Sequence, residues 1–297
     1  MKSALHLCRN KSKSLAFQRR MLPVSGQHTL KASTTADRRP TDTSTCSISG
    51  GSSPTCTPNV QHLCRDGGNT VAYRLGWMIQ TNGNAPGVLF LPGFMSNMNG
   101  GKAVALERFC TKAGLAYMRF DYQGCGASKG SLKPGIDAFD VWRWDALAVL
   151  DQLTSGPQIL VGSSMGGALM LLLALERPKR IQALIGLATA VSFTKQLNDS
   201  DLSTKQVTSD GTYITPKDFI NKKYWRCLKD DSLAVHCPIR LLHGMQDETV
   251  PFMTSLDVAQ RVESKDVDVI LRKSGDHRLS QEGDIRLLTK TLESLIV

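Results

Sequence analysis

The sequence predicts an α/β fold, with a mostly parallel sheet flanked by helices and a small cap insertion. Short apolar runs alternate with longer amphipathic stretches from about residue 70 onwards, which is typical of strand–helix–strand units. The apolar runs are rich in Val, Ile and Leu, as in strands that are buried on both faces of a parallel sheet.

The expected strands and helices alternate along this part of the chain. Strands are predicted at residues 70–79, 87–91, 116–121, 158–162, 181–187, 238–242 and 267–272. Helices are predicted at residues 101–113, 137–154, 166–176, 252–262 and 283–296. The polar, irregular interval 191–236 is expected to be a cap over the carboxyl ends of the strands, where open α/β sheets bind ligands.

The positive charge is concentrated at the start of the chain. The net charge is +10, but residues 1–36 contain seven Lys and Arg and no acid, which leaves 29 basic against 26 acidic residues elsewhere. The nearly neutral remainder gives no indication of nucleic-acid binding. Hydrophobic residues make up 41% of the chain, yet no apolar run approaches the ~20 residues of a membrane span, so no transmembrane segment is expected.

Three segments are expected. Residues 1–40 are basic, Ser-rich and nearly free of acid, which indicates a mitochondrial transit peptide and a matrix location; a disordered basic tail is the alternative. Residues 41–68 are dense in Ser, Thr, Gly and Pro and are expected to be a disordered linker. The folded domain would then span residues 69–297, including the cap. The eight cysteines form no C-x-x-C pair, so we expect free thiols in a reducing compartment.

The strongest local motif is I-L-V-G-S-S-M-G-G-A-L-M-L at residues 159–171. A nucleophile on a sharp strand-to-helix turn needs small residues two places before and after it. Gly162 and Gly166 meet this requirement for Ser164, whereas Val161 excludes Ser163. A solvated serine in an ordinary glycine-rich turn is the competing interpretation, because G-x-S-x-G alone is common. The position between a buried strand and an apolar helix favours the nucleophile elbow of an α/β-hydrolase fold.

The acid and the histidine should follow the serine in this fold. His277 comes directly after the last predicted strand, where a loop can carry it over the nucleophile as general base. Asp247 follows the strand at 238–242 and can orient this histidine. Glu248, Asp199 and Asp201 remain competitors for the acid. The earlier His243 ends its strand and is assigned a packing or hydrogen-bonding role.

The oxyanion hole is expected to use backbone N–H groups from two loops. One is that of Met165, directly after the nucleophile, and the other is that of Phe94 in F-L-P-G-F-M-S-N-M-N-G at residues 90–100. A plain Pro-Gly turn is the alternative for the second loop. Met95 and Met98, with Met165, could form an apolar wall for an acyl chain or could fill the core.

No cofactor or metal is expected. The glycines of D-Y-Q-G-C-G-A-S-K at residues 121–129 lack the spacing of a dinucleotide-binding loop, since position 129 is Lys. A loop packed beside the active site explains this segment better. No Cys/His group has zinc-ligand spacing.

Long strings around all these positions resemble one family. F-L-P-G-F-M-S-N-M-N-G-G-K-A, Y-M-R-F-D-Y-Q-G-C-G-A-S, Q-I-L-V-G-S-S-M-G-G, C-P-I-R-L-L-H-G-M-Q-D-E-T-V-P and D-V-D-V-I-L-R-K-S-G-D-H-R are similar to the family of mitochondrial α/β-hydrolase domain-containing protein 10. The resemblance covers residues 85–192 and 236–297, and the cap matches poorly. It implies a palmitoyl-protein thioesterase that also removes glucuronic acid from acyl glucuronides, with the family's triad on Ser164, Asp247 and His277.

The residues and the resemblance together predict a serine hydrolase of acyl thioesters and esters. Its expected partners are S-acylated proteins and small acyl esters or acyl glucuronides, without nucleic acid. Two alternatives stay open: a general carboxylesterase or peptidase on the same scaffold, and a non-catalytic ligand-binding protein. An epoxide hydrolase is disfavoured, because that chemistry needs a carboxylate nucleophile where this chain has Ser164.

Overall fold

The computed structural model of the chain describes residues 60–65, 68–76, 85–130, 132, 138–191, 206–207, 213–214, 228 and 232–296. The predicted transit peptide at residues 1–40, most of the predicted linker, and Asp199 and Asp201 lie outside these residues. All the described residues belong to one domain, which spans Thr55–Val297.

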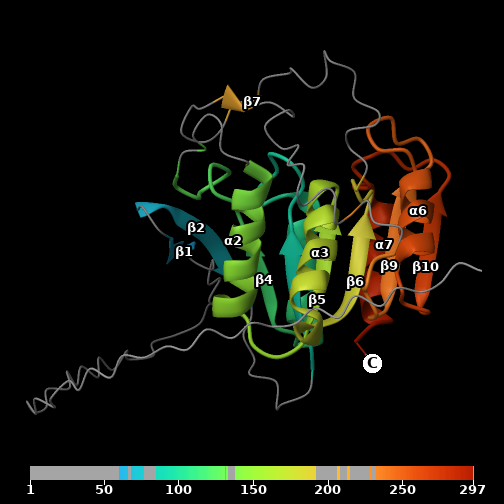
Figure 1. Cartoon of the computed structure of the whole chain (residues 1–297), viewed down its shortest axis with the longest axis horizontal. Helices are drawn as coiled ribbons and strands as arrows, with labels where there is room; N and C mark the ends of the chain where they lie inside the picture. Colours follow the sequence, from blue (N-terminus) through green and yellow to red (C-terminus); the bar gives the residue numbers. More distant parts are fainter. Residues whose placement is uncertain are drawn as a thin grey trace, which may run out of the picture. The chain divides into compact units, whose positions relative to one another are not determined.

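An eight-stranded sheet forms the centre of this domain (Figure 1). Its strands are β1 (Gln61–Cys64), β2 (Thr70–Leu75), β3 (Gly87–Leu91), β4 (Tyr117–Phe120), β5 (Gln158–Ser163), β6 (Ile181–Leu187), β9 (Ile239–Gly244) and β10 (Val267–Arg272). Their order across the sheet is β1-β2-β4-β3-β5-β6-β9-β10. The pairs β1–β2 and β2–β4 are antiparallel, and the strands from β4 to β10 pair in parallel. The predicted α/β class with a mostly parallel sheet is confirmed.

Helices pack on both faces of the sheet. They are α1 (Gly101–Ala113), α2 (Ala138–Leu153), α3 (Met165–Glu176), α6 (Met253–Arg261) and α7 (Glu282–Glu293). One core cluster joins the sheet to α2, α3 and α6, and a second joins it to α1 and α7. Strand β3 contributes Leu89 and Leu91 to the first cluster, and Val88 and Phe90 to the second. This alternation follows from the two-residue period of a strand.

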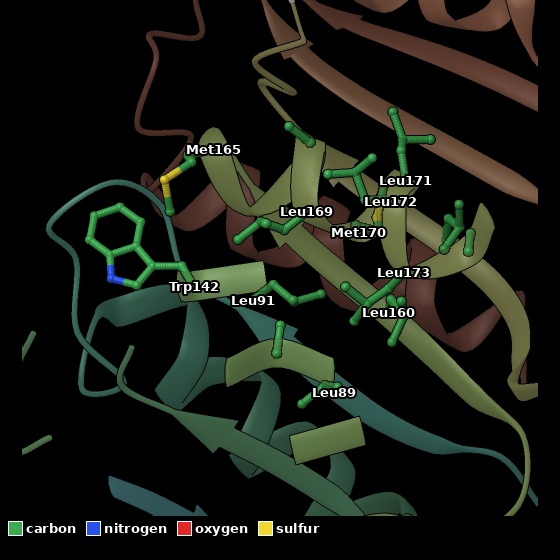
Figure 2. Close-up of a cluster of buried hydrophobic side chains, with 14 of the residues drawn as sticks. Leu89, Leu91, Trp142, Leu160, Met165, Leu169, Met170, Leu171, Leu172 and Leu173 are labelled. Atoms are coloured by element: carbon green, nitrogen blue, oxygen red, sulfur yellow. The ribbon is translucent and has the colours of Figure 1, made fainter. Parts of the chain in front are cut away.

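Helix α3 is the most deeply buried helix of the described part. All its residues from Met165 to Ala174 are buried, and Figure 2 shows Leu169 and Leu173 against Leu89, Leu91 and Leu160 of the sheet. A helix that is apolar on all sides is held by packing from every direction. The beginning of α3, where the predicted nucleophile lies, is therefore fixed by the core.

The domain begins earlier than the sequence predicted. Strand β1 lies inside the segment 41–68 that was assigned to a disordered linker, and it pairs with β2 from Gln61↔Tyr73 to Cys64↔Thr70. Q-H-L-C is four residues long, largely exposed and at the sheet edge, so its strand conformation depends on β2 and not on a local apolar pattern. Of the predicted strand at 70–79, the structure has β2 at Thr70–Leu75, and residues 77–79 lie outside the described residues.

Only a small part of the predicted cap at 191–236 is described. It contains β7 (Gln206–Val207) and β8 (Tyr213–Ile214), which form a separate two-stranded antiparallel sheet. Leu228, Leu233 and Val235 are buried against the main core. Across the described ranges, every helix is too short or too polar to cross a bilayer.

Candidate active site

Ser164 occupies the sharp turn between β5 and α3. Its φ of +53° is unusual for a residue with a side chain. The Ser164 N–H donates to the carbonyl oxygen of Leu187 at 2.8 Å, and the Ser164 carbonyl oxygen accepts from the Ala190 N–H at 3.1 Å. These bonds to the end of β6 and the loop behind it hold the strained conformation that exposes the hydroxyl.

The two glycines around Ser164 are required by backbone contacts. A Cβ atom on Gly166 would overlap the carbonyl oxygen of Leu91, and one on Gly162 would overlap the carbonyl oxygen of Gly166. The strand and helix approach too closely at the elbow for any side chain at these two positions. The G-x-S-x-G spacing therefore has a steric cause in this chain.

His277 connects Ser164 to Asp247. Its Nε2 atom lies 3.0 Å from Oγ of Ser164, and its Nδ1 atom lies 2.7 Å from Oδ2 of Asp247. The imidazole is 25% exposed, whereas the Asp247 carboxylate is fully buried. The structure thus brings together the three side chains that the sequence selected. Such a chain can move the serine proton to the imidazole while the carboxylate stabilises the resulting cation.

The loops that carry Asp247 and His277 are hydrogen-bonded to each other. The Met245 N–H donates to the carbonyl oxygen of Arg272 at 2.9 Å, and the Gln246 N–H donates to that of Gly275 at 3.0 Å. The two loops follow β9 and β10, which are neighbouring parallel strands. Both loops therefore leave the sheet at the same edge. The relative position of acid and base is therefore set by the sheet.

Asp247 is surrounded by N–H donors. Its Oδ1 accepts from the backbone N–H groups of Thr249 at 2.9 Å and Val250 at 2.7 Å, and its Oδ2 lies 3.1 Å from Nε2 of His243. Burial by itself raises the pKa of this carboxyl, but the hydrogen bonds from His243, His277 and Val250 outweigh it. The net pKa is well below the usual range, so the carboxylate stays ionised.

Of the three competitors for the acid, only Glu248 lies within the described residues. Glu248 is exposed, and its carboxylate makes no hydrogen bond to His277 within the described residues. Its neighbour Asp247 points inward because its Oδ1 caps the turn at Thr249 and Val250.

The loop after β3 lies directly against the elbow. A Cβ atom on Gly93 would be 3.4 Å from Cβ of Ser164. Phe94 is the next residue, so its backbone starts beside the nucleophile. Met165 is the first residue of α3, where a backbone N–H has no acceptor inside the helix. Both predicted oxyanion-hole residues therefore flank Ser164.

Two charged residues that sequence reasoning missed hold this loop. Asp121 follows β4 and accepts the Met98 N–H on Oδ1 at 2.6 Å, and Arg119 in β4 donates to the Met98 carbonyl oxygen. Asp121 also accepts the Ala127 N–H on Oδ2 at 2.8 Å. Both charges lie in R-F-D at the end of a buried strand, which is the signal that could have revealed them.

The segment D-Y-Q-G-C-G-A-S-K is the loop that wraps around Asp121. Gly126 has a φ of +52°, and a Cβ atom on it would overlap the Asp121 carboxylate. Burial raises the pKa of the Cys125 thiol in this loop to about 12, so this thiol is not a nucleophile at neutral pH.

A cavity of about 530 Å³ opens at Ser164 and His277. Its described lining is more polar than the apolar pocket expected for an acyl chain, and includes Ser96, Asn97, Lys102, Thr249, Arg278 and Ser280 beside Phe90 and Phe94. Met95, Met98 and Met165 are not among the lining residues; Met98 is fully buried, and the other two belong to or pack against the core. The structure thus favours core filling for these methionines.

Lys102 and Arg278 form a cationic part of this lining. The Lys102 ammonium donates to the carbonyl oxygen of Arg278. Burial lowers the Lys102 pKa, the charges of Asp276 and Asp284 raise it, and the Arg278 charge lowers it, with a net decrease. No Asp or Glu occurs among the described lining residues. Within the described ranges, no group of His, Cys, Asp and Glu is suited to hold a metal ion.

Comparison with known proteins identifies related chains. A family described as alpha/beta hydrolase fold matches residues 86–214. Palmitoyl-protein thioesterase ABHD10, mitochondrial, from Bos taurus is 46% identical over 228 residues, which cover 72% of this chain and 74% of that protein. The Homo sapiens protein of the same name is 45% identical over the same shares.

Solved structures give the same relationship. Alpha/beta hydrolase domain-containing protein 10 from mouse is 42% identical, with a TM-score of 0.68 over 80% of this chain and 98% of that chain. A putative hydrolase from Agrobacterium vitis is 26% identical, with a TM-score of 0.69 over 81% of this chain and 98% of its own. The chain therefore belongs to the α/β-hydrolase domain-containing protein 10 family of α/β hydrolases.

Proposed function

We propose that this chain is a mitochondrial serine hydrolase that cleaves acyl thioesters and esters, including S-palmitoylated proteins. The observation that supports the proposal best is the position of His277, within hydrogen-bonding distance of both Ser164 Oγ and Asp247 Oδ2. The thioesterase names of the relatives support the substrate class. Their mitochondrial names and the acid-poor, basic leader support a mitochondrial, matrix location.

The reaction has two steps. Ser164 Oγ attacks the acyl carbonyl carbon while Nε2 of His277 takes the hydroxyl proton, and the carbon–sulfur or carbon–oxygen bond breaks as His277 returns that proton to the leaving thiol or alcohol. Water then attacks the acyl-enzyme by the same proton path and releases the acid. The backbone N–H groups of Phe94 and Met165 would stabilise the oxyanion in both steps.

An acyl glucuronide is a second substrate favoured by a specific feature. Lys102 and Arg278 line the cavity beside the nucleophile without a lining carboxylate in the described part. Two basic side chains in the cavity that contains the nucleophile fit a leaving group that carries a carboxylate, as glucuronic acid does. A simple aliphatic ester has no charge that could interact with these two groups.

Labelling and turnover of the purified protein test the proposal. A fluorophosphonate probe should label Ser164, as located by peptide mapping, and Ser164→Ala should abolish labelling and lower thioester turnover by several orders of magnitude while the protein stays folded. Ser232→Ala, an exposed serine paired with Glu263, is the matched control. Labelling of Ser163 instead, or turnover by Ser164→Ala near the wild-type rate, would contradict the proposal.

A substrate panel separates the remaining alternatives. Preference for S-acyl peptides and acyl glucuronides over simple esters supports the proposed substrates, whereas equal turnover of all small esters favours a general carboxylesterase. Cleavage of peptide amides would favour a peptidase. A protein that binds acyl ligands but neither reacts with the probe nor turns over any substrate would be a receptor on a hydrolase scaffold.

A further inference from the structure

A second histidine contacts the carboxylate of Asp247. His243 lies near the end of β9 (Ile239–Gly244) and is fully buried. Its Nε2 atom is 3.1 Å from Oδ2 of Asp247 and 2.9 Å from the carbonyl oxygen of Val250, and its Nδ1 atom is 2.7 Å from Oγ of Ser255. Both ring nitrogens are therefore occupied inside the protein.

The partners of His243 determine where its proton lies. A carboxylate and a carbonyl oxygen can only accept hydrogen bonds, so Nε2 must carry the proton that faces them. The Ser255 hydroxyl, at the beginning of α6 (Met253–Arg261), can donate to Nδ1 and fix this tautomer. His243 is thus a N–H donor aimed at the loop that carries Asp247.

This donor reaches the same oxygen atom as His277. Oδ2 of Asp247 lies 3.1 Å from His243 Nε2 and 2.7 Å from His277 Nδ1, while Oδ1 is occupied by the two backbone N–H groups of Thr249 and Val250. The rotation of the carboxylate is fixed by contacts on both oxygens. The direction in which Oδ2 presents its remaining lone pair to His277 is therefore set in part by His243.

We propose that His243 is a positioning residue for catalysis, which acts by holding the Asp247 carboxylate in the orientation that His277 requires. The inference rests on the proposed triad and extends it by one residue. A purely packing role would need only an apolar side chain of similar volume. The three polar contacts of a fully buried ring, one of them to the oxygen used by His277, instead indicate a hydrogen-bonding role in the site.

Two substitutions at this position separate positioning from packing. His243→Leu fills the space without a donor and should lower kcat about tenfold to a hundredfold, the effect of losing one hydrogen bond to a charged group, with KM within about twofold because His243 does not reach the cavity. His243→Gln has an amide N–H₂ to donate and an amide oxygen for the Ser255 hydroxyl, so it should restore kcat to within about threefold of the wild type.

A double-mutant cycle with Asp247→Ala shows whether His243 acts through the carboxylate. Once Asp247 is removed, His243→Leu should lower the rate of fluorophosphonate labelling by less than about twofold, because the group that it positions is gone. Wild-type kcat for His243→Leu, or an equal loss with and without Asp247, would overturn the inference. Loss of activity in Ser164→Ala and Asp247→Ala with a fully active His243→Leu would refute only this step and leave the triad standing.

If His243→Leu does not fold, Ser255→Ala replaces it in the double-mutant cycle. It keeps the His243 donor but removes the hydroxyl that fixes the ring, so a smaller loss of kcat, about twofold to fivefold, is expected. That loss should again disappear in the Asp247→Ala background. An undiminished loss there would overturn the inference by the same logic.

Discussion

Nδ1 of His277 lies 2.7 Å from Oδ2 of Asp247, although the two residues belong to different loops. The loops follow neighbouring parallel strands and are joined by backbone hydrogen bonds from Met245 and Gln246. The contact is therefore built into the sheet and does not require a substrate to form it. If it orients the base, its loss should affect turnover more than substrate binding.

Asp247→Asn should lower kcat by about 10⁴-fold, the loss known for this replacement in a serine protease triad, and change KM little. The amide cannot balance the imidazolium charge, and it can impose the wrong histidine tautomer. Steady-state kinetics on a thioester substrate measure both constants. Glu248→Gln changes the adjacent, exposed carboxylate and should keep wild-type turnover; the opposite ranking would move the acid to Glu248.

The meeting of Ser164, Asp247 and His277 could be predicted because each residue follows a simple topological rule. Ser164 lies between a buried strand and an apolar helix, and Asp247 and His277 each follow a predicted strand. Parallel strands bring their carboxyl ends to one edge, so chain order alone suggested the meeting point. Only the structure shows that Nε2 of His277 lies 3.0 Å from Oγ of Ser164.

Other features depend on contacts between distant segments and left no local signal. Strand β1 is a four-residue edge strand defined by pairing with β2. Lys102 enters the cavity from α1 and meets the loop of Arg278, 176 residues further along the chain. Met98 in the loop after β3 is fully buried, and Asp121 and Arg119 bind its backbone; the hydrophobic pattern does not reveal the direction of a loop.

Gly166→Ala should destabilise the protein by about 3 kcal/mol, the upper end of the usual cost of forcing an atom into a well-packed region, because the added Cβ would overlap the carbonyl oxygen of Leu91. Urea unfolding followed by circular dichroism measures the change. Gly101→Ala is the matched control, since nothing lies within 4 Å of its added Cβ. That substitution, at the first residue of α1, should be neutral or slightly stabilising. Equal losses in both variants would contradict the steric origin of the elbow glycines.

Asp145 should make the folded state less stable as the pH rises from about 4 to about 6. Burial in α2 raises its pKa from 3.8 to about 6, although the hydrogen bond from the Gln123 N–H and the charge of Arg65 both lower it. The folded state therefore binds this proton more tightly than the unfolded state. The stability that it contributes is complete below the unfolded pKa and is lost as the pH rises through the folded one.

Asp145→Asn removes this dependence. The difference between the unfolding free energies of wild type and variant should change by about 2 kcal/mol between pH 6 and pH 4, in favour of the wild type at the lower pH. Urea unfolding at a series of pH values measures it. Asp151→Asn, on the exposed side of the same helix, gives the slope for a surface carboxylate, and an identical slope for Asp145→Asn would contradict the role of burial.

Arg278→Ala should discriminate between substrates by the charge of their leaving groups. Arg278 lines the cavity with Lys102, so its charge can attract a substrate carboxylate there. Loss of a charge-assisted hydrogen bond should raise KM for an acyl glucuronide about tenfold, while KM for the matching methyl ester stays unchanged. The wild-type preference for the glucuronide should also weaken at high salt, because the attraction is electrostatic.

Arg286→Ala removes an exposed arginine from α7 outside the cavity lining and should leave both KM values as they are. Parallel increases for the charged and the neutral ester would mean that Arg278 shapes the cavity without reading charge, and the acyl-glucuronide proposal would lose its structural support.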